Sequence, residues 1–120
     1  MRKAQLPDVL TEHIRATNAF DTDAILATFT GDAYVQDIAR EFVGHAAIRA
    51  FIEKEIVGDH VTYDPVEVLE HHGEWIVRVK TDGDYDKSDL PDPLILTHYF
   101  RLDGEKIASV ITIRVRPADY

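Results

Sequence analysis

Three ionisable residues of this sequence fall on surfaces that are otherwise apolar, and all three are of types that transfer protons. The segment 32–37 alternates like a β-strand and directs Asp37 to its apolar side. His13 belongs to the apolar stripe of an N-terminal helix, and His98 lies on the apolar face of a strand predicted over 94–102. A carboxylate and two imidazoles that share one interior would form a site for general acid–base chemistry.

Apolar surroundings constrain each of these side chains. An ionised carboxylate without partners is costly to bury, so we expect Asp37 to have a hydrogen-bond donor, a raised pKa, or both. Each residue also has a purely structural interpretation. A histidine on an apolar face is commonly a hydrogen-bonded part of the core, and Asp37 can instead cap the turn at 38–41. The spacing of the three residues leaves both interpretations open.

Hydrophobic periodicity places three helices in the first half of the chain. Apolar or small residues recur at helical spacing over 6–17, and Pro7 suits the first position of that helix. A short second helix is predicted over 20–29, with Asp21 as its N-cap. A third is predicted over 44–58, where the last residue is a glycine suited to a helix C-terminus.

The hydrophobic pattern changes from helical to alternating near residue 60. Two short strands are predicted between the second and third helices, and four long strands follow, over 60–72, 74–81, 94–102 and 106–115. Helices followed by a run of antiparallel strands indicate an α+β domain. We expect a single domain over 1–120 in which three helices pack in a strongly curved, mixed but mainly antiparallel sheet. Such a sheet would form a cone with an internal pocket.

The order of elements and two sequence segments resemble a known superfamily. Helix, helix, strand pair, helix and four long strands is the order of the nuclear-transport-factor-two-like cone fold, and the likeness covers nearly the whole chain. The segments NAFDTDAILATFTGDAYVQD (18–37) and VGHAAIRAFI (43–52) resemble the SnoaL-like polyketide cyclase and ketosteroid isomerase branch. In that branch an acidic strand end precedes a glycine-led third helix.

The resemblance implies a role for Asp37. It places Asp37 where ketosteroid isomerase carries the general base that moves a proton between carbons of an enolisable ketone, while a tyrosine and a protonated aspartic acid hold the oxyanion. Here His13 occupies the position of that tyrosine and His98 that of the aspartic acid. One alternative is that two neutral imidazoles donate to the oxyanion. The other is that Asp37 orients a histidine that acts as acid or base, as in the related scytalone dehydratase.

The resemblance therefore implies a small-molecule pocket protein. It favours a cofactor-independent isomerase or lyase, of dehydratase or cyclase type, that acts by proton transfer on a small apolar substrate. Asp37, His13 and His98 are the candidate catalytic residues, and no metal or cofactor is expected. The alternative is a non-catalytic ligand-binding or dimerisation module of the same fold. Four aromatic residues are candidates for the substrate pocket: Tyr34, Phe51, Trp75 and Phe100.

The last predicted strand suggests how two copies could associate. Simple alternation puts one set of residues on a single face, namely Ile107, Ser109, Ile111, Ile113 and Val115. An apolar outer face on a long strand favours a homodimer formed sheet to sheet, as in relatives of this fold.

Composition excludes several other functions. The 120 residues contain no cysteine, which rules out disulfides, thiolate metal sites and cysteine nucleophiles. Acidic residues outnumber basic ones 22 to 13, and the formal charge of −9 disfavours nucleic acid and anionic membranes as partners. The N-terminus shows no apolar segment typical of a secretory signal, so a cytoplasmic location is expected. Asp82, Asp84 and Asp86 begin like a calcium loop, but Lys87 replaces the required glycine.

Overall fold

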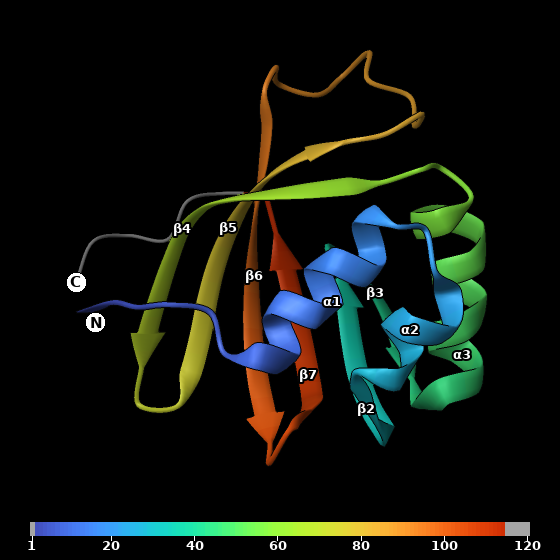
Figure 1. Cartoon of the computed structure of the whole chain (residues 1–120). Coiled ribbons are helices and arrows are strands. Elements are labelled where there is room, and N and C mark those ends of the chain that lie inside the picture. The colour runs from blue at the N-terminus through green and yellow to red at the C-terminus, as the bar shows by residue number, and fades with distance from the viewer. Residues whose placement is uncertain (1, 115–120) are drawn as a thin grey trace.

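The structure, a computed structural model, describes residues 2–114 as helices packed against one face of a strongly curved sheet (Figure 1). The helices are α1 (Asp8–Asn18), α2 (Thr22–Ala27) and α3 (Gly44–Phe51), and α3 continues into the π-helical segment η1 (Ile52–Val57). The strands are β1 (Arg2–Lys3), β2 (Phe29–Asp37), β3 (Arg40–Val43), β4 (Thr62–His71), β5 (Glu74–Asp82), β6 (Leu94–Asp103) and β7 (Lys106–Ile113). The predicted three helices, strand pair and four long strands are all present.

One sheet contains every strand, in the order β1-β4-β5-β6-β7-β2-β3. Neighbouring strands run antiparallel except β2 and β7, which are parallel. The structure therefore confirms an α+β fold with a mixed, mainly antiparallel sheet. Because β2 lies beside β7, the register pairs Asp37 with Thr112, although these residues are far apart in the sequence. The two-residue strand β1, which pairs with β4, was not predicted.

Helix boundaries follow the local chemistry of the sequence. In α1 most of the buried residues belong to the predicted stripe, including Leu10 and His13, and Ala16 is buried as well. Pro7 is the N-cap of α1, one position before the predicted one, because its ψ of 158° is extended and not helical. Asp21 caps α2 as predicted, and its Oδ1 accepts a hydrogen bond from the backbone N–H of Ala24 at 3.0 Å.

The third helix changes its winding halfway. It is α-helical to Phe51 and π-helical from Ile52 to Val57. Gly58 ends it as predicted, but with a φ of −58° and not with the left-handed conformation usual for a terminal glycine. Space explains the glycine: a Cβ at this position would lie 2.2 Å from the carbonyl oxygen of Lys54.

Two β-bulges change which residues face inward. In β4 the pairing with β5 skips Val66, and in β7 the pairing with β6 skips Ala108. The second bulge corrects the predicted alternation of the last strand. Ile107 is fully buried in the core, whereas Ile111 is 36% exposed on the outer face of the sheet. Val115, the last residue of the predicted row, lies outside the described residues.

The hydrophobic core lies between the helices and the inner face of the sheet. Its most completely buried members come from separate elements, among them Leu10, Ile48, Val77 and Ile107. Within the part of the chain that the structure describes, no helix is long and apolar enough to cross a membrane.

The close approach of the Lys54 carbonyl oxygen to Gly58 gives a stability prediction. We expect Gly58→Ala to lower the free energy of unfolding by about 1–3 kcal/mol, the usual cost of forcing extra volume into a packed position. Gly31→Ala is the matched control, because a Cβ there would meet nothing within 4 Å. Urea unfolding midpoints of both variants check this, and equal midpoints would contradict the steric explanation.

Candidate functional site

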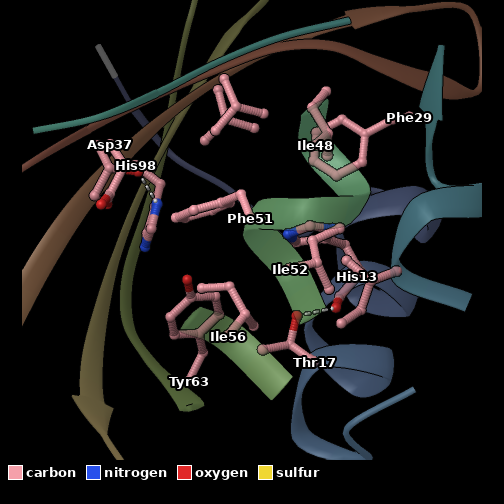
Figure 2. Close-up of a pocket in the computed structure, with 14 residues that line it drawn as sticks. His13, Thr17, Phe29, Asp37, Ile48, Phe51, Ile52, Ile56, Tyr63 and His98 are labelled. Atoms are coloured by element: carbon pink, nitrogen blue, oxygen red, sulfur yellow. Dashed lines mark hydrogen bonds between the residues drawn. The ribbon is translucent and has the colours of Figure 1, made fainter. Parts of the chain in front are cut away.

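A small cavity lies between the sheet and the third helix, and the three predicted ionisable residues all line it (Figure 2). His13 comes from α1, Asp37 from the end of β2 and His98 from β6. The rest of the wall is mostly apolar and includes Ile48 and Ile52. The predicted convergence of these side chains on one interior is therefore a feature of the structure, while their chemical roles stay a prediction.

His13 is buried, with 7% of its surface exposed, and one of its ring nitrogens has a partner. Its Nδ1 lies 3.0 Å from Oγ1 of Thr28, the residue after α2. The imidazole also meets the rings of Phe29 and Phe100 edge to face, with centroids 5.4 and 5.6 Å away. Aromatic rings and one hydroxyl thus hold the imidazole in place, and Nε2 has no hydrogen-bond partner among the described residues.

His98 has a similar arrangement on the neighbouring strand pair. Its Nδ1 lies 2.8 Å from Oγ1 of Thr112 in β7, and the residue is 4% exposed. Its Nε2 is buried and has no hydrogen-bond partner among the described residues. Buried polar atoms are nearly always paired, so an unpaired nitrogen beside a cavity indicates a place for a ligand atom or a water.

Both imidazoles are neutral at neutral pH. Burial lowers the pKa of His13 to about 4 from its ordinary 6.5. Burial, together with the nearby His13, lowers the pKa of His98 to about 3. Each ring therefore has one N–H and one lone pair, and neither ring supplies a positive charge to the cavity.

Asp37 is partly exposed and is held by a cation. Its Oδ2 accepts a hydrogen bond of 2.7 Å from Arg40, which also pairs with Glu55 of η1 at 2.7 Å. Its Oδ1 has no partner among the described residues, and neither imidazole is bonded to Asp37. Arg40 supplies the donor that a carboxylate at this position was expected to have. Ile38, in the turn between Asp37 and Arg40, has a strained φ of 59°.

Sequence reasoning missed Tyr63, which also lines the cavity. Its ring lies 5.0 Å from that of His98, and Figure 2 shows its hydroxyl directed into the space below that imidazole. Burial raises the pKa of Tyr63, and the negative charge of Asp37 raises it further. The phenol is therefore a protonated hydrogen-bond donor at physiological pH.

Of the four predicted pocket aromatics, Phe51 lines the cavity and the other three do not. The hydroxyl of Tyr34 donates to Glu41, so this side chain lies along the β2–β3 hairpin. Trp75 packs against the core, and Phe100 is buried behind the imidazole of His13. Alternation correctly places Phe100 on the inner face, but inner residues of a curved sheet fill the core as well as the cavity.

The cavity has a narrow inner end and a wider mouth. The inner part encloses about 480 Å³ of empty space, measured out to its open side. The centre of a water molecule can occupy only about 40 Å³ of that space. In the mouth, the volume that the centre of a water molecule can occupy is about 260 Å³. The two parts adjoin, because they share wall residues that include Asp37, Phe51 and Tyr63. Tyr85 and Leu90, from the acidic loop after β5, form part of the mouth.

A curved sheet around three helices, with an apolar cavity that ends in a few polar groups, defines a pocket protein of the nuclear-transport-factor-two-like class. The chain belongs to the SnoaL-like domain family, which matches residues 10–110. No curated protein matches the chain closely enough to be called a relative.

Solved structures agree with this assignment. A candidate polyketide cyclase from Sinorhizobium meliloti is 28% identical, with a TM-score of 0.80 over 90% of this chain and 95% of that chain. SalBIII, an epoxide hydrolase/cyclase-like enzyme of pyran ring formation in salinomycin, is 24% identical, with a TM-score of 0.73 over 88% and 86%. A protein with a ketosteroid isomerase-like fold from Catenulispora acidiphila, in complex with trimethylamine, is 16% identical, with a TM-score of 0.77 over 91% and 86%. The last two likenesses show the fold alone.

The buried imidazoles predict how stability depends on pH. Both groups titrate near 6.5 when exposed and near 4 and 3 in the folded protein. Below about pH 6.5 the unfolded chain binds protons at these two histidines that the folded protein does not bind. The contribution of the two histidines to the free energy of unfolding therefore falls as the pH drops and is constant above that pH. Each group contributes a slope of about 1.4 kcal/mol per pH unit in this window.

We expect His98→Leu to remove about half of the stability loss between pH 6.5 and 4.5, because one of the two histidines then no longer titrates. Urea unfolding at several pH values measures this slope. His72→Gln, a change at an exposed histidine, is the control and should leave the slope as it is. An unchanged slope in His98→Leu would show that this imidazole is not buried in its neutral form.

Proposed function

We propose that this protein is a cofactor-independent enzyme, an isomerase or lyase, that transfers protons next to an oxygen atom of a small, mostly apolar substrate. One observation carries the proposal: a buried, unpaired nitrogen, Nε2 of His98, faces the same cavity as the carboxylate of Asp37. Buried polar atoms are nearly always paired, so an unpaired nitrogen beside a cavity favours a binding site.

Each polar group has a role that its geometry permits. Asp37 is the proton acceptor, through Oδ1, since Arg40 holds Oδ2. His98 donates from Nε2 to the substrate oxygen when the hydroxyl of Thr112 donates to its Nδ1. Tyr63 supplies a second donor from β4. The negative charge that develops on the oxygen would thus be stabilised by neutral donors in a site largely closed to water.

Cavity dimensions restrict the substrate to a particular shape. An apolar cavity of about 150 Å³ holds benzene in a protein, so the inner 40 Å³ has room only for a small polar head. The mouth, at 260 Å³, has room for a ring or a short chain. We therefore propose that the oxygen function enters first and that the apolar body of the substrate stays in the mouth.

A non-catalytic ligand-binding module is the second candidate. The ion pair of Asp37 with Arg40 favours it, because this pair occupies one carboxylate oxygen and no hydrogen bond joins Asp37 to either imidazole. In this alternative Asp37 anchors the β2–β3 hairpin, and the cavity binds ligands without changing them.

Exchange of α-protons for deuterium distinguishes the two candidates. The wild-type protein should catalyse this exchange in small enolisable ketones and β-hydroxy ketones, because removal of an α-proton is the first step of isomerisation and of water elimination alike. Asp37→Asn should reduce the rate by about 10²–10⁴-fold, the usual contribution of a general base. NMR in D₂O measures the rate.

Arg101→Gln, at an exposed position remote from the cavity, is the control and should exchange at the wild-type rate. Ketones that bind, by chemical-shift titration, but do not exchange would favour the non-catalytic module. Equal exchange rates in the wild type and in Asp37→Asn would remove Asp37 from the mechanism.

We further propose a homodimer that forms through the outer face of the sheet. The register aligns Leu69, Ile76, Tyr99 and Ile111 in a row across four strands. Ile111, at 36% exposure, is a large apolar residue left open to solvent in this row.

A dimer of this kind should dissociate when a charge enters the row. Ile111→Glu is expected to yield monomers at concentrations where the wild type sediments as a dimer, because an unpaired carboxylate in an apolar interface is costly. Analytical ultracentrifugation checks this. Val43→Glu, at an exposed position on the edge strand β3, is the control, and a monomeric wild type would refute the proposal.

A further inference from the structure

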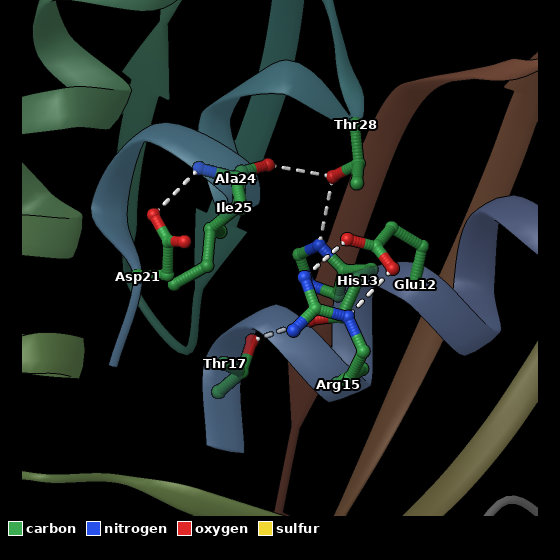
Figure 3. A network of polar contacts seen from close by, with 8 residues as sticks. All are labelled: Glu12, His13, Arg15, Thr17, Asp21, Ala24, Ile25 and Thr28. Carbon is green, nitrogen blue, oxygen red and sulfur yellow. Dashed lines mark hydrogen bonds and ion pairs between the residues drawn. The ribbon is translucent and has the colours of Figure 1, made fainter. Parts of the chain in front are cut away.

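The hydroxyl of Thr28 has two neighbours and only one proton. Its Oγ1 lies 2.6 Å from the carbonyl oxygen of Ile25 and 3.0 Å from Nδ1 of His13 (Figure 3). A carbonyl oxygen can only accept a hydrogen bond, so the proton of Thr28 points to Ile25. The hydroxyl then faces His13 with its lone pairs.

His13 must therefore carry its proton on Nδ1. A lone pair on Nδ1 would place two acceptors 3.0 Å apart with no proton between them, which is repulsive. A neutral imidazole has one N–H, so Nε2 of His13 carries a lone pair and can only accept. The low pKa that burial gives His13 keeps the ring neutral and this assignment stable.

The second imidazole is not restricted in this way. Oγ1 of Thr112 contacts Nδ1 of His98 and no other partner among the described residues. Its hydroxyl can rotate, so Thr112 can either donate to or accept from His98. The cavity thus contains one nitrogen that always accepts, on His13, and one that can donate or accept, on His98.

We propose that His13 is a specificity-determining residue that makes the inner end of the cavity select ligands with a hydroxyl group over ligands with a carbonyl group of the same shape. A hydroxyl can donate to Nε2 of His13. A carbonyl would instead oppose its own lone pairs to that nitrogen and leave it without a hydrogen bond, which is unfavourable.

This inference rests on one part of the proposed function, namely that the cavity is the substrate site. It narrows the class of substrate. The substrate would be a small, mostly apolar alcohol, or a carbonyl compound that presents an enol or a neighbouring hydroxyl at the inner end. Ring closure uses a hydroxyl as the nucleophile and releases its proton to an acceptor such as Nε2 of His13, so the geometry favours this reaction over the isomerisation of a simple ketone. In water elimination the departing hydroxyl must instead gain a proton, which this nitrogen cannot supply.

The wild-type protein tests the fixed tautomer directly. Long-range ¹H–¹⁵N NMR of the imidazoles distinguishes a protonated nitrogen from one with a lone pair. We expect His13 to carry its proton on Nδ1 at pH 7, and a proton on Nε2 would overturn the proposal. This measurement involves no variant and no substrate, so it is independent of catalysis.

Binding of a matched pair of probes tests the selectivity. Cyclohexanol and cyclohexanone share a ring and differ in the ability to donate, and we expect the alcohol to bind roughly tenfold more tightly, the effect of one buried hydrogen bond made or lost. NMR titration measures both affinities. Equal affinities, tighter binding of the ketone, or binding of neither probe would overturn the proposal.

Thr28→Val should reverse the preference, because without an acceptor at Nδ1 the proton of His13 moves to Nε2, where it faces the cavity. Thr112→Val is the matched control: it changes the equivalent partner of His98 and should leave the tautomer of His13 unchanged. An alcohol preference that persists in Thr28→Val would overturn the proposal. If selectivity is found but no ketone exchanges its α-protons, the proposed catalysis fails while the specificity of His13 stands.

Discussion

The interior of this protein depends on keeping two imidazoles out of water without ionising them. Each ring is enclosed by aromatic and aliphatic side chains, and each has one threonine hydroxyl as a partner. The fold meets this condition at two places: Thr28, directly after α2, reaches His13, and Thr112 in β7 lies opposite His98 in β6. The remaining polar groups of the cavity are arranged around two rings that are rigid and uncharged.

Much of the fold could be predicted because the signals are local. Helical and alternating periodicities, the N-cap at Asp21 and the glycine after η1 each act within a few residues. The bulges at Val66 and Ala108 were not predictable, because the extra residue is visible only against the pairing strand. Simple alternation therefore put Ile107 on the same face as Ile111, whereas the structure buries Ile107 and leaves Ile111 36% exposed.

The candidate site was predictable in part. Side-chain direction on a helix and two strands brought His13, Asp37 and His98 to one cavity. Their partners could not be found in this way, because Thr28 and Thr112 lie 15 and 14 residues from the histidines that they contact. Arg40 could have been inferred, since it faces Asp37 across a two-residue hairpin turn. Tyr63 could not, because it and Val68 both pack inward only through the bulge between them.

That bulge in β4 has a consequence for how such a site can evolve. Loss of the single codon for Val66 would restore regular pairing between β4 and β5. Because side chains alternate strictly along a strand, each residue before the deletion would then face the opposite side of the sheet. Tyr63 would then leave the cavity, and Thr62 or Asp64 would take its place. A phenol could thus be exchanged for a hydroxyl or a carboxylate by a deletion and not by a substitution, while the sheet stays intact. Lineages with this fold could diversify their chemistry through changes in chain length at one position.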